Sequence, residues 1–179
     1  PIRGLGASGA NSISRKFDKN RLISSQDIVN NGLDWASIDT FSSKLQDRVP
    51  LIVNTDVSSS GGIHWITFFP IDKTIYIVDS LGARNNRPYD NIMFDTFKKN
   101  GYKYKIYNGE FQYTDDSLCG WFAIFVAKML QSNSNKINSN NIFRLVENTF
   151  GKTSDDNDIQ ELISSFGMTA NGQMDKIYD

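Results

Sequence analysis

The chain has 179 residues, 39% of them hydrophobic, and its 19 lysines and arginines nearly balance its 20 aspartates and glutamates, for a net charge of −1. This length and composition predict one globular domain and exclude a disordered chain. The near-zero charge gives no support for sequence-independent binding to nucleic acid. No apolar run approaches the roughly 20 residues that span a bilayer, and the first residues lack a secretory signal pattern, so we expect neither membrane insertion nor secretion.

The N-terminal part of the chain is predicted to be an arm followed by two short helices. Residues 1–20 are rich in glycine, serine, asparagine and charge, which is typical of a flexible arm, and we expect a single domain over 21–179. Helices are predicted over 24–30 and 34–46, the second with Asp34 as a candidate N-cap. Three large apolar residues recur in the second helix at helical spacing: Ile38, Phe41 and Leu45.

Apolar and β-branched segments in the middle of the chain predict a sheet. Buried strands are predicted over 49–54, 63–69 and 74–79. The short segment 70–73 joins the last two, so they are predicted to form a β-hairpin. In residues 102–107, lysines alternate with aromatic residues and isoleucine, which indicates a half-exposed strand.

The remaining elements are predicted helices. Residues 119–131 are apolar nearly all round, which is typical of a central buried helix. Other helices are predicted over 89–99, 141–150 and 155–166. In the first of these, three residues are expected to face inward: Ile92, Met93 and Phe97. The fold class is therefore α+β, with a mostly antiparallel or mixed central sheet packed on a buried helix that begins at a cysteine, and with further helices around it.

The sequence contains one cysteine, Cys119, and one histidine, His64. A single cysteine excludes an intramolecular disulfide and a four-cysteine zinc site, and a single histidine excludes a histidine-rich one. We therefore expect no metal and no other cofactor. Any chemistry between a thiol and an imidazole must use these two residues, and an unpaired functional thiol is typical of a reducing, intracellular compartment.

Cys119 directly follows a polar loop and begins the predicted central helix. The unpaired amides and the dipole at a helix N-terminus stabilise a thiolate. The amide of Cys119 would also point toward a carbonyl oxygen under attack, as one half of an oxyanion hole, and Gly120 would leave room for a substrate backbone. The alternative is a buried structural cysteine.

His64 and Asp79 lie at opposite ends of the predicted hairpin, His64 near the start of the first strand and Asp79 at the end of the second. Antiparallel pairing would place these two ends side by side. Asp79 could then accept the imidazole N–H and hold the tautomer that a general base needs. The alternatives are a structural histidine and an aspartate that only caps the following turn.

Gln112 lies seven residues before Cys119, and its side-chain amide could donate the second hydrogen bond of an oxyanion hole. Taken together, the chain order of His64, Asp79, Gln112 and Cys119 resembles that of the adenovirus protease (adenain) family. The wider clan includes the proteases of ubiquitin-like proteins and bacterial acetyltransferase effectors. The resemblance covers roughly residues 49–130. It is carried by these segments: Gly61-Gly62-Ile63-His64-Trp65, Thr74-Ile75-Tyr76-Ile77-Val78-Asp79-Ser80-Leu81-Gly82, Gln112 and Cys119-Gly120.

This resemblance implies a cysteine endopeptidase with a Cys-His-Asp triad and a glutamine in the oxyanion hole. It also implies protein substrates, namely capsid, core or scaffold precursors that a virus or virophage cleaves during maturation in the virion and the infected host cell. The adenovirus-type recognition pattern is an aliphatic residue, any residue, glycine, any residue, and cleavage before glycine. Residues 2–6 fit this pattern, which predicts self-cleavage between Leu5 and Gly6.

Two features depart from adenain. The acid is Asp79, as in the proteases of ubiquitin-like proteins, where adenain has glutamate, and the interval from the histidine is two residues shorter. Adenain uses an activating peptide joined by a disulfide and also uses DNA, but this chain has no second cysteine and no basic excess, so we carry over neither. The alternatives are another enzyme of the clan, either a ubiquitin-like-modifier protease or an acetyltransferase effector, and a catalytically silent scaffold or binding domain.

Overall fold

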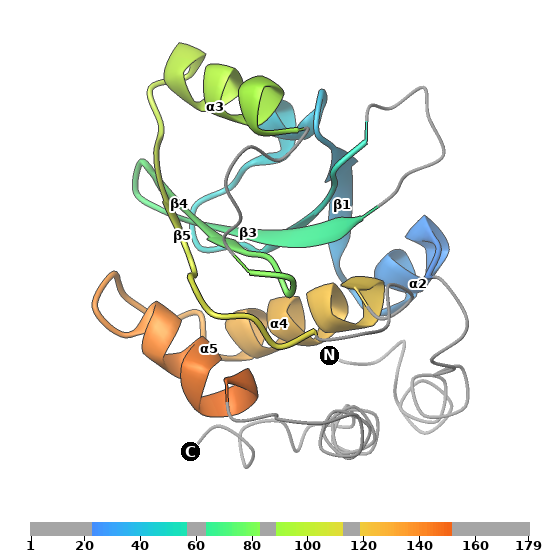
Figure 1. Ribbon diagram of the computed structural model, residues 1–179, viewed down its shortest axis with the longest axis vertical. Coiled ribbons are helices and arrows are strands. Elements are labelled where there is room, and N and C mark those ends of the chain that lie inside the picture. The colour runs from blue at the N-terminus through green and yellow to red at the C-terminus, as the bar shows by residue number, and fades with distance from the viewer. Residues whose placement is uncertain (1–22, 57–63, 83–88, 113–118, 152–179) are drawn as a thin grey trace.

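A five-stranded mixed sheet forms the centre of the molecule (Figure 1). The computed structural model describes residues 23–56, 64–82, 89–112 and 119–151. The strands follow the chain order across the sheet. Their bounds are β1 Asp34–Ser37, β2 Leu51–Asn54, β3 Trp65–Ile71, β4 Thr74–Val78 and β5 Lys103–Ile106.

Pairing in the sheet is antiparallel at its centre and parallel at both edges. Strand β3 pairs antiparallel with β2 and with β4, whereas β1 runs parallel to β2 and β5 runs parallel to β4. Together with the helices, this arrangement confirms the predicted α+β class with a mixed sheet. The edge strand β5 is more exposed than the predicted half-exposed strand, because Tyr104 is exposed as well as Lys103 and Lys105.

The predicted hairpin is present, with a tighter turn than expected. Strands β3 and β4 pair up to Ile71 and Thr74, so only Asp72 and Lys73 form the loop. Asp72 adopts a positive φ of 54°, which aspartate tolerates better than most residues, and its amide donates to the Asp47 carboxylate at 2.7 Å. The register of this hairpin places the start of β3 beside the end of β4.

The prediction of a helix over residues 34–46 is wrong. Residues Asp34–Ser37 form β1, and only Phe41–Lys44 coil, as the 3₁₀ helix η3. The Asp34 carboxylate accepts the amide of its neighbour Trp35 at 2.8 Å instead of capping a helix. Ile38 and Phe41 are buried, but they belong to a turn that packs on the sheet and not to a helix. The pairing of β1 with β2 therefore outweighed the local preference for a helix.

The other helices lie close to their predicted ranges. They are α2 Ser25–Asn30, α3 Asp90–Lys99, α4 Cys119–Ser132 and α5 Ile142–Phe150. In α3, Met93 and Phe97 face inward as expected, but Ile92 is 40% exposed, contrary to expectation. The predicted arm at 1–20 and the predicted helix at 155–166 lie outside the described residues.

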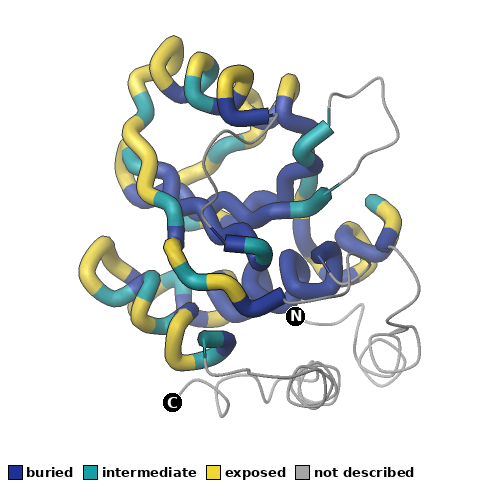
Figure 2. The backbone as a smooth tube through the Cα atoms, viewed as in Figure 1, coloured by how far each residue is buried: buried dark blue, intermediate teal, exposed yellow. Residues whose placement is uncertain are grey.

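Two apolar layers cover the two faces of the sheet. On one face α4 packs across β3, and α2 and α5 join the same cluster, whereas α3 and η3 cover the opposite face. Neighbouring residues of β3 alternate between these layers, so Phe68 packs with α3 and Phe69 with α4. Figure 2 shows α4 as buried for almost its whole length, and every residue from Cys119 to Leu130 is buried.

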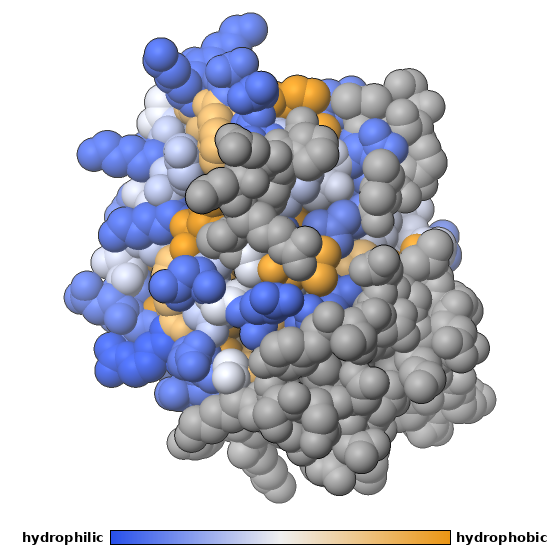
Figure 3. Space-filling model, viewed as in Figure 1, coloured by the Kyte–Doolittle hydropathy of each residue, from blue (hydrophilic) through white to orange (hydrophobic). Residues whose placement is uncertain are grey.

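Outside these layers the described surface is mainly hydrophilic in the view of Figure 3. The large apolar residues that are exposed in the described part of the chain come from four different segments: Val29, Val49, Ile92 and Tyr104. Scattered single residues of this kind are normal on the surface of a globular domain and do not define a docking surface.

Candidate active site

The site is built where β3 begins and β4 ends. His64 directly precedes β3, and its carbonyl accepts the amide of Thr55 at 2.8 Å, which continues the pairing between β2 and β3 by one residue. Asp79 directly follows β4. If the register of Thr67 opposite Val78 is continued, His64 and Asp79 become diagonal neighbours across the hairpin. Their side chains meet, with His64 Nε2 2.7 Å from Asp79 Oδ1.

The Asp79 carboxylate is buried and accepts hydrogen bonds from His64, Leu81 and Tyr89. Besides the imidazole, the Leu81 amide donates to Oδ1 at 2.9 Å and the Tyr89 hydroxyl donates to Oδ2 at 2.8 Å. Burial by itself would raise the pKa of Asp79, but the hydrogen bond and charge of His64, with the bonds from Tyr89 and Leu81, outweigh it and lower the pKa. The carboxylate is therefore ionised at neutral pH and holds the imidazole in place.

The imidazole of His64 lies between Asp79 and Cys119. Burial lowers its pKa, but hydrogen bonds to the Asp79 carboxylate and the Cys119 sulfur, with the charges of both groups, raise the pKa to about 9. Since Asp79 binds Nε2, Nδ1 is the ring nitrogen that remains for the sulfur. A histidine with this pKa is protonated at neutral pH.

Cys119 is the first residue of α4, as predicted, and its side chain is buried, with 2% exposure. Gly120 does not have the predicted role of leaving room for substrate. A Cβ placed on Gly120 would lie 2.1 Å from Cγ1 of Ile23, so the side chain of Ile23 occupies that space. Ile23, two residues before α2, is thus packed against the start of α4.

Gln112 is buried beside the end of β4. The Gln112 and Phe111 amides both donate to the Ser80 carbonyl, at 2.9 and 3.0 Å. The Ser80 hydroxyl donates to Gln112 Oε1 at 2.5 Å. The structure thus joins His64 to Asp79 and to Cys119, and it ties Gln112 to the residue that follows Asp79.

Sequence reasoning missed two contributors to the site, Tyr89 and Ser80. Tyr89 was the first residue of a predicted helix, and nothing in its local sequence indicated that its hydroxyl reaches a carboxylate ten residues earlier. Ser80 was part of the motif that carried the resemblance, but it received no role of its own. The segment 61–63 before His64 lies outside the described residues.

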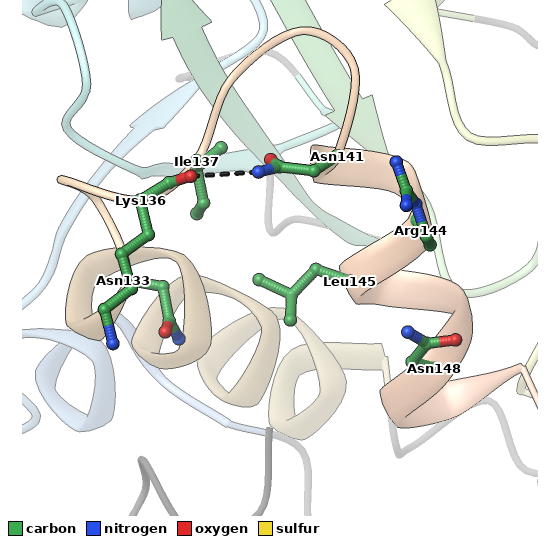
Figure 4. Close-up of a pocket in the computed structure, with 7 residues that line it drawn as sticks. All are labelled: Asn133, Lys136, Ile137, Asn141, Arg144, Leu145 and Asn148. Atoms are coloured by element: carbon green, nitrogen blue, oxygen red, sulfur yellow. Dashed lines mark hydrogen bonds between the residues drawn. The ribbon is translucent and has the colours of Figure 1, made fainter. Parts of the chain in front are cut away.

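Other features of the described residues lie away from this site or do not suit a metal or a membrane span. They contain no group of three or more histidine, cysteine or acidic residues that could hold a metal ion. None of the helices in these ranges is long and apolar enough to cross a membrane. A hollow of about 220 Å³ lies between the C-terminal end of α4 and α5 (Figure 4). It contains none of the predicted site residues, and polar side chains line most of it, among them Lys136 and Arg144.

A mixed sheet packed on a helix that begins at a cysteine, with a histidine and an aspartate at the adjacent strand ends, is the arrangement expected of a cysteine protease. Residues 39–165 match the adenovirus endoprotease family, and the chain belongs to this family. The match includes all four predicted site residues.

Comparisons with individual proteins are less informative than the family match. No curated protein sequence matches the chain significantly. Among solved structures, the chain is similar to AvrA carrying a one-residue deletion, in a complex with IP6 and CoA, with a TM-score of 0.47 and 14% sequence identity. The match covers 87% of this chain and 66% of that one, so this chain spans somewhat less than two thirds of its length.

Proposed function

We propose that the protein is a cysteine endopeptidase in which Cys119 is the nucleophile, His64 is the acid and base, and Asp79 orients His64. One observation carries this proposal: the only imidazole in the sequence is 2.7 Å from a buried carboxylate, and the only thiol, at the N-terminus of a helix, helps to raise the pKa of that imidazole. A nucleophile, a base within hydrogen-bond reach and a third group that orients the base are the three parts that nucleophilic catalysis requires.

The first half of the reaction forms a thioester. The Cys119 thiolate attacks the peptide carbonyl carbon, and the electron pair of the C=O bond moves to oxygen. The resulting oxyanion accepts hydrogen bonds from the Cys119 amide and from the Gln112 side-chain amide. As the intermediate collapses, the C–N bond breaks, and protonated His64 gives its proton to the leaving amine.

The second half returns the enzyme to its starting state. Neutral His64 takes a proton from water while the water oxygen attacks the thioester carbonyl. The C–S bond then breaks, which releases the carboxylic acid product and leaves the thiolate of Cys119 beside protonated His64. Asp79 stabilises the charged imidazole in both halves and keeps Nδ1 directed at the reacting atoms.

For substrates we propose capsid, core or scaffold precursor proteins cleaved during virion maturation, in the virion and the infected cell. The support is membership of the adenovirus endoprotease family. The pattern at residues 2–6 further suggests that the enzyme cuts its own chain between Leu5 and Gly6. Both residues lie outside the described ranges.

The proposal is tested with the full-length protein and a fluorogenic peptide that spans residues 1–12 of the chain. Wild-type protein is expected to cut this peptide between Leu5 and Gly6, and Cys119→Ala is expected to lower the rate by about 10⁴-fold or more, because nucleophile and base act as a unit. Cys119→Ala should keep its circular dichroism spectrum. Lys136→Ala, at the distant hollow, is the matched control and should cut at the wild-type rate.

Three further measurements separate the alternatives. Cleavage of a SUMO-type fusion and not of the peptide would indicate a modifier protease, and transfer from acetyl-CoA to a target protein would indicate an acetyltransferase. Alkylation of Cys119 by iodoacetamide at neutral pH tests for a silent scaffold. A rate no faster than that of a free model thiol, with no cleavage of any probe, would contradict the enzyme assignment.

A further inference from the structure

The two residues that follow β4 serve different parts of the site. Asp79 holds the imidazole of His64, whereas Ser80, the next residue, binds Gln112 and is 4% exposed. Among the described residues, the Ser80 hydroxyl hydrogen-bonds Gln112 and neither His64 nor Cys119. The Ser80 side chain is therefore placed to act on Gln112 and not on the base or the nucleophile.

Ser80 binds the Gln112 segment through both its backbone and its side chain. The Ser80 carbonyl accepts the consecutive amides of Phe111 and Gln112, at 3.0 and 2.9 Å, which fixes where the backbone of this segment lies. The Ser80 hydroxyl donates to Gln112 Oε1 at 2.5 Å, which fixes which way the side-chain amide faces. Gln112 is itself 1% exposed, so water does not compete for this contact.

The direction of the amide decides whether Gln112 can help the reaction. A glutamine side chain has one end that only accepts hydrogen bonds and one that only donates, and the two ends have nearly the same shape. An oxyanion is stabilised by the NH₂ end and repelled by the oxygen. Holding Oε1 on Ser80 directs Nε2 the opposite way, and a donor that is already oriented needs no reorganisation when charge develops.

We propose that Ser80 is a positioning residue that orients the Gln112 side chain so that its NH₂ group, and not its oxygen, is presented to the oxyanion. This inference rests on the proposed peptidase function and deepens it. It assigns the strand end at Asp79 and Ser80 a double role, in which one residue orients the base and the next orients the oxyanion donor.

The test compares Ser80→Ala, Gln112→Ala and the double variant with wild type in peptide cleavage. Removing an oxyanion donor costs about 10²–10³ in kcat, so Gln112→Ala is expected in that range, and Ser80→Ala, which loses only the orientation, at about tenfold. KM should change little, because the oxyanion exists only after attack. In the Gln112→Ala background, Ser80→Ala should have no further effect on kcat, because the residue it orients is gone.

Two controls separate positioning from a general structural effect. Alkylation of Cys119 by iodoacetamide uses the thiolate and forms no tetrahedral oxyanion, so Ser80→Ala should alkylate at the wild-type rate with an unchanged pH profile. Ser80→Thr keeps the hydroxyl and should restore most of kcat. Ser37→Ala removes another buried serine hydroxyl, at the end of β1, and should leave kcat unchanged.

The contact itself is checked without turnover by a double-mutant cycle in thermal unfolding. The two single substitutions should not be additive in Tm, because either one removes the same hydrogen bond. Additive shifts would overturn the contact. Wild-type kcat in a folded Ser80→Ala, or an undiminished effect of Ser80→Ala on kcat in the Gln112→Ala background, would overturn the role of Ser80 alone. A wild type that cuts no probe, with Cys119 no more reactive than a free thiol, would instead overturn the proposed function.

Discussion

The acid–base half of the site and the thiol half are held by different forces. His64 and Asp79 are fixed by the hairpin register and by hydrogen bonds to one buried carboxylate. Cys119 is fixed by a helix that is buried on all sides and by the packing of Ile23 against its second residue. Hydrogen bonds fix the direction in which a side chain points, whereas apolar packing fixes where its backbone lies. The two halves of the site should therefore respond differently to substitution.

The hydrogen-bonded half is tested most severely by Asp79→Asn. An amide in place of the carboxylate removes the charge that stabilises the imidazolium and favours the wrong tautomer, so kcat should fall by up to about 10⁴-fold. The pKa of His64, about 9 in the wild type, should also fall toward its ordinary value. The titration is followed by NMR of the histidine ring.

The same substitution changes how stability depends on pH. A histidine whose pKa is raised in the folded state adds stability that is fully present below the unfolded pKa of about 6.5. That stability is lost as pH rises through the folded pKa of about 9. Urea unfolding between pH 6 and 10 should show this loss in wild type and a much smaller one in Asp79→Asn. Equal slopes would contradict the charged His64–Asp79 pair.

The packed half is tested by Gly120→Ala. The new Cβ would meet Cγ1 of Ile23 at 2.1 Å, which is too close for any side chain, so Ile23 or the helix must move. Overpacking of this kind costs about 1–3 kcal/mol, and thermal unfolding should report it. Peptide cleavage should fall as well, because the nucleophile is the preceding residue.

The matched control for this prediction compares Ile23→Ala with the double variant that carries both Ile23→Ala and Gly120→Ala. Truncation removes Cγ1 and Cδ1, and the remaining Cβ of residue 23 lies 3.1 Å from the added methyl. Gly120→Ala should therefore cost less in the Ile23→Ala background than in the wild type. The same cost in both backgrounds would show that Ile23 is not what excludes a side chain at Gly120.

A smaller effect in the hydrogen-bonded half is expected from Tyr89→Phe. The change removes one donor to Asp79 Oδ2 and leaves the His64 and Leu81 contacts in place. A hydrogen bond to a charged group contributes about 1.5–3 kcal/mol, so stability should fall by that order and kcat by only a few-fold. Tyr104→Phe, on the exposed strand β5, is the control and should change neither quantity measurably.

The sequence predicted those parts of the fold that depend on strong local patterns. The all-apolar segment at α4 and the paired β-branched segments of the hairpin both appear where they were expected. Strand β1 was mistaken for a helix because its pairing partner, β2, lies outside the sequence window in which the helical spacing was read. Long-range pairing of this kind leaves no local trace.

In the site, too, contacts that follow from local patterns were predictable and long-range contacts were not. The proximity of His64 and Asp79 follows from hairpin geometry and was predictable, whereas the contribution of Tyr89 depends on how α3 meets the sheet. The hydrogen bond from Ser80 to Gln112 depends on the path of a loop, so the local sequence does not predict it either. The catalytic roles of His64, Asp79, Gln112 and Cys119 remain predictions that the variants above test.

The lysines of β5 have a consequence for how the protein behaves at high concentration. An unpaired strand edge is a template on which other chains can add, and proteins commonly block it with charge. Lys103 and Lys105 are exposed on the outermost strand, so two such edges brought together would oppose like charges. These charges oppose edge-to-edge pairing at β5, and replacing both lysines with threonine should make the protein precipitate at lower concentration.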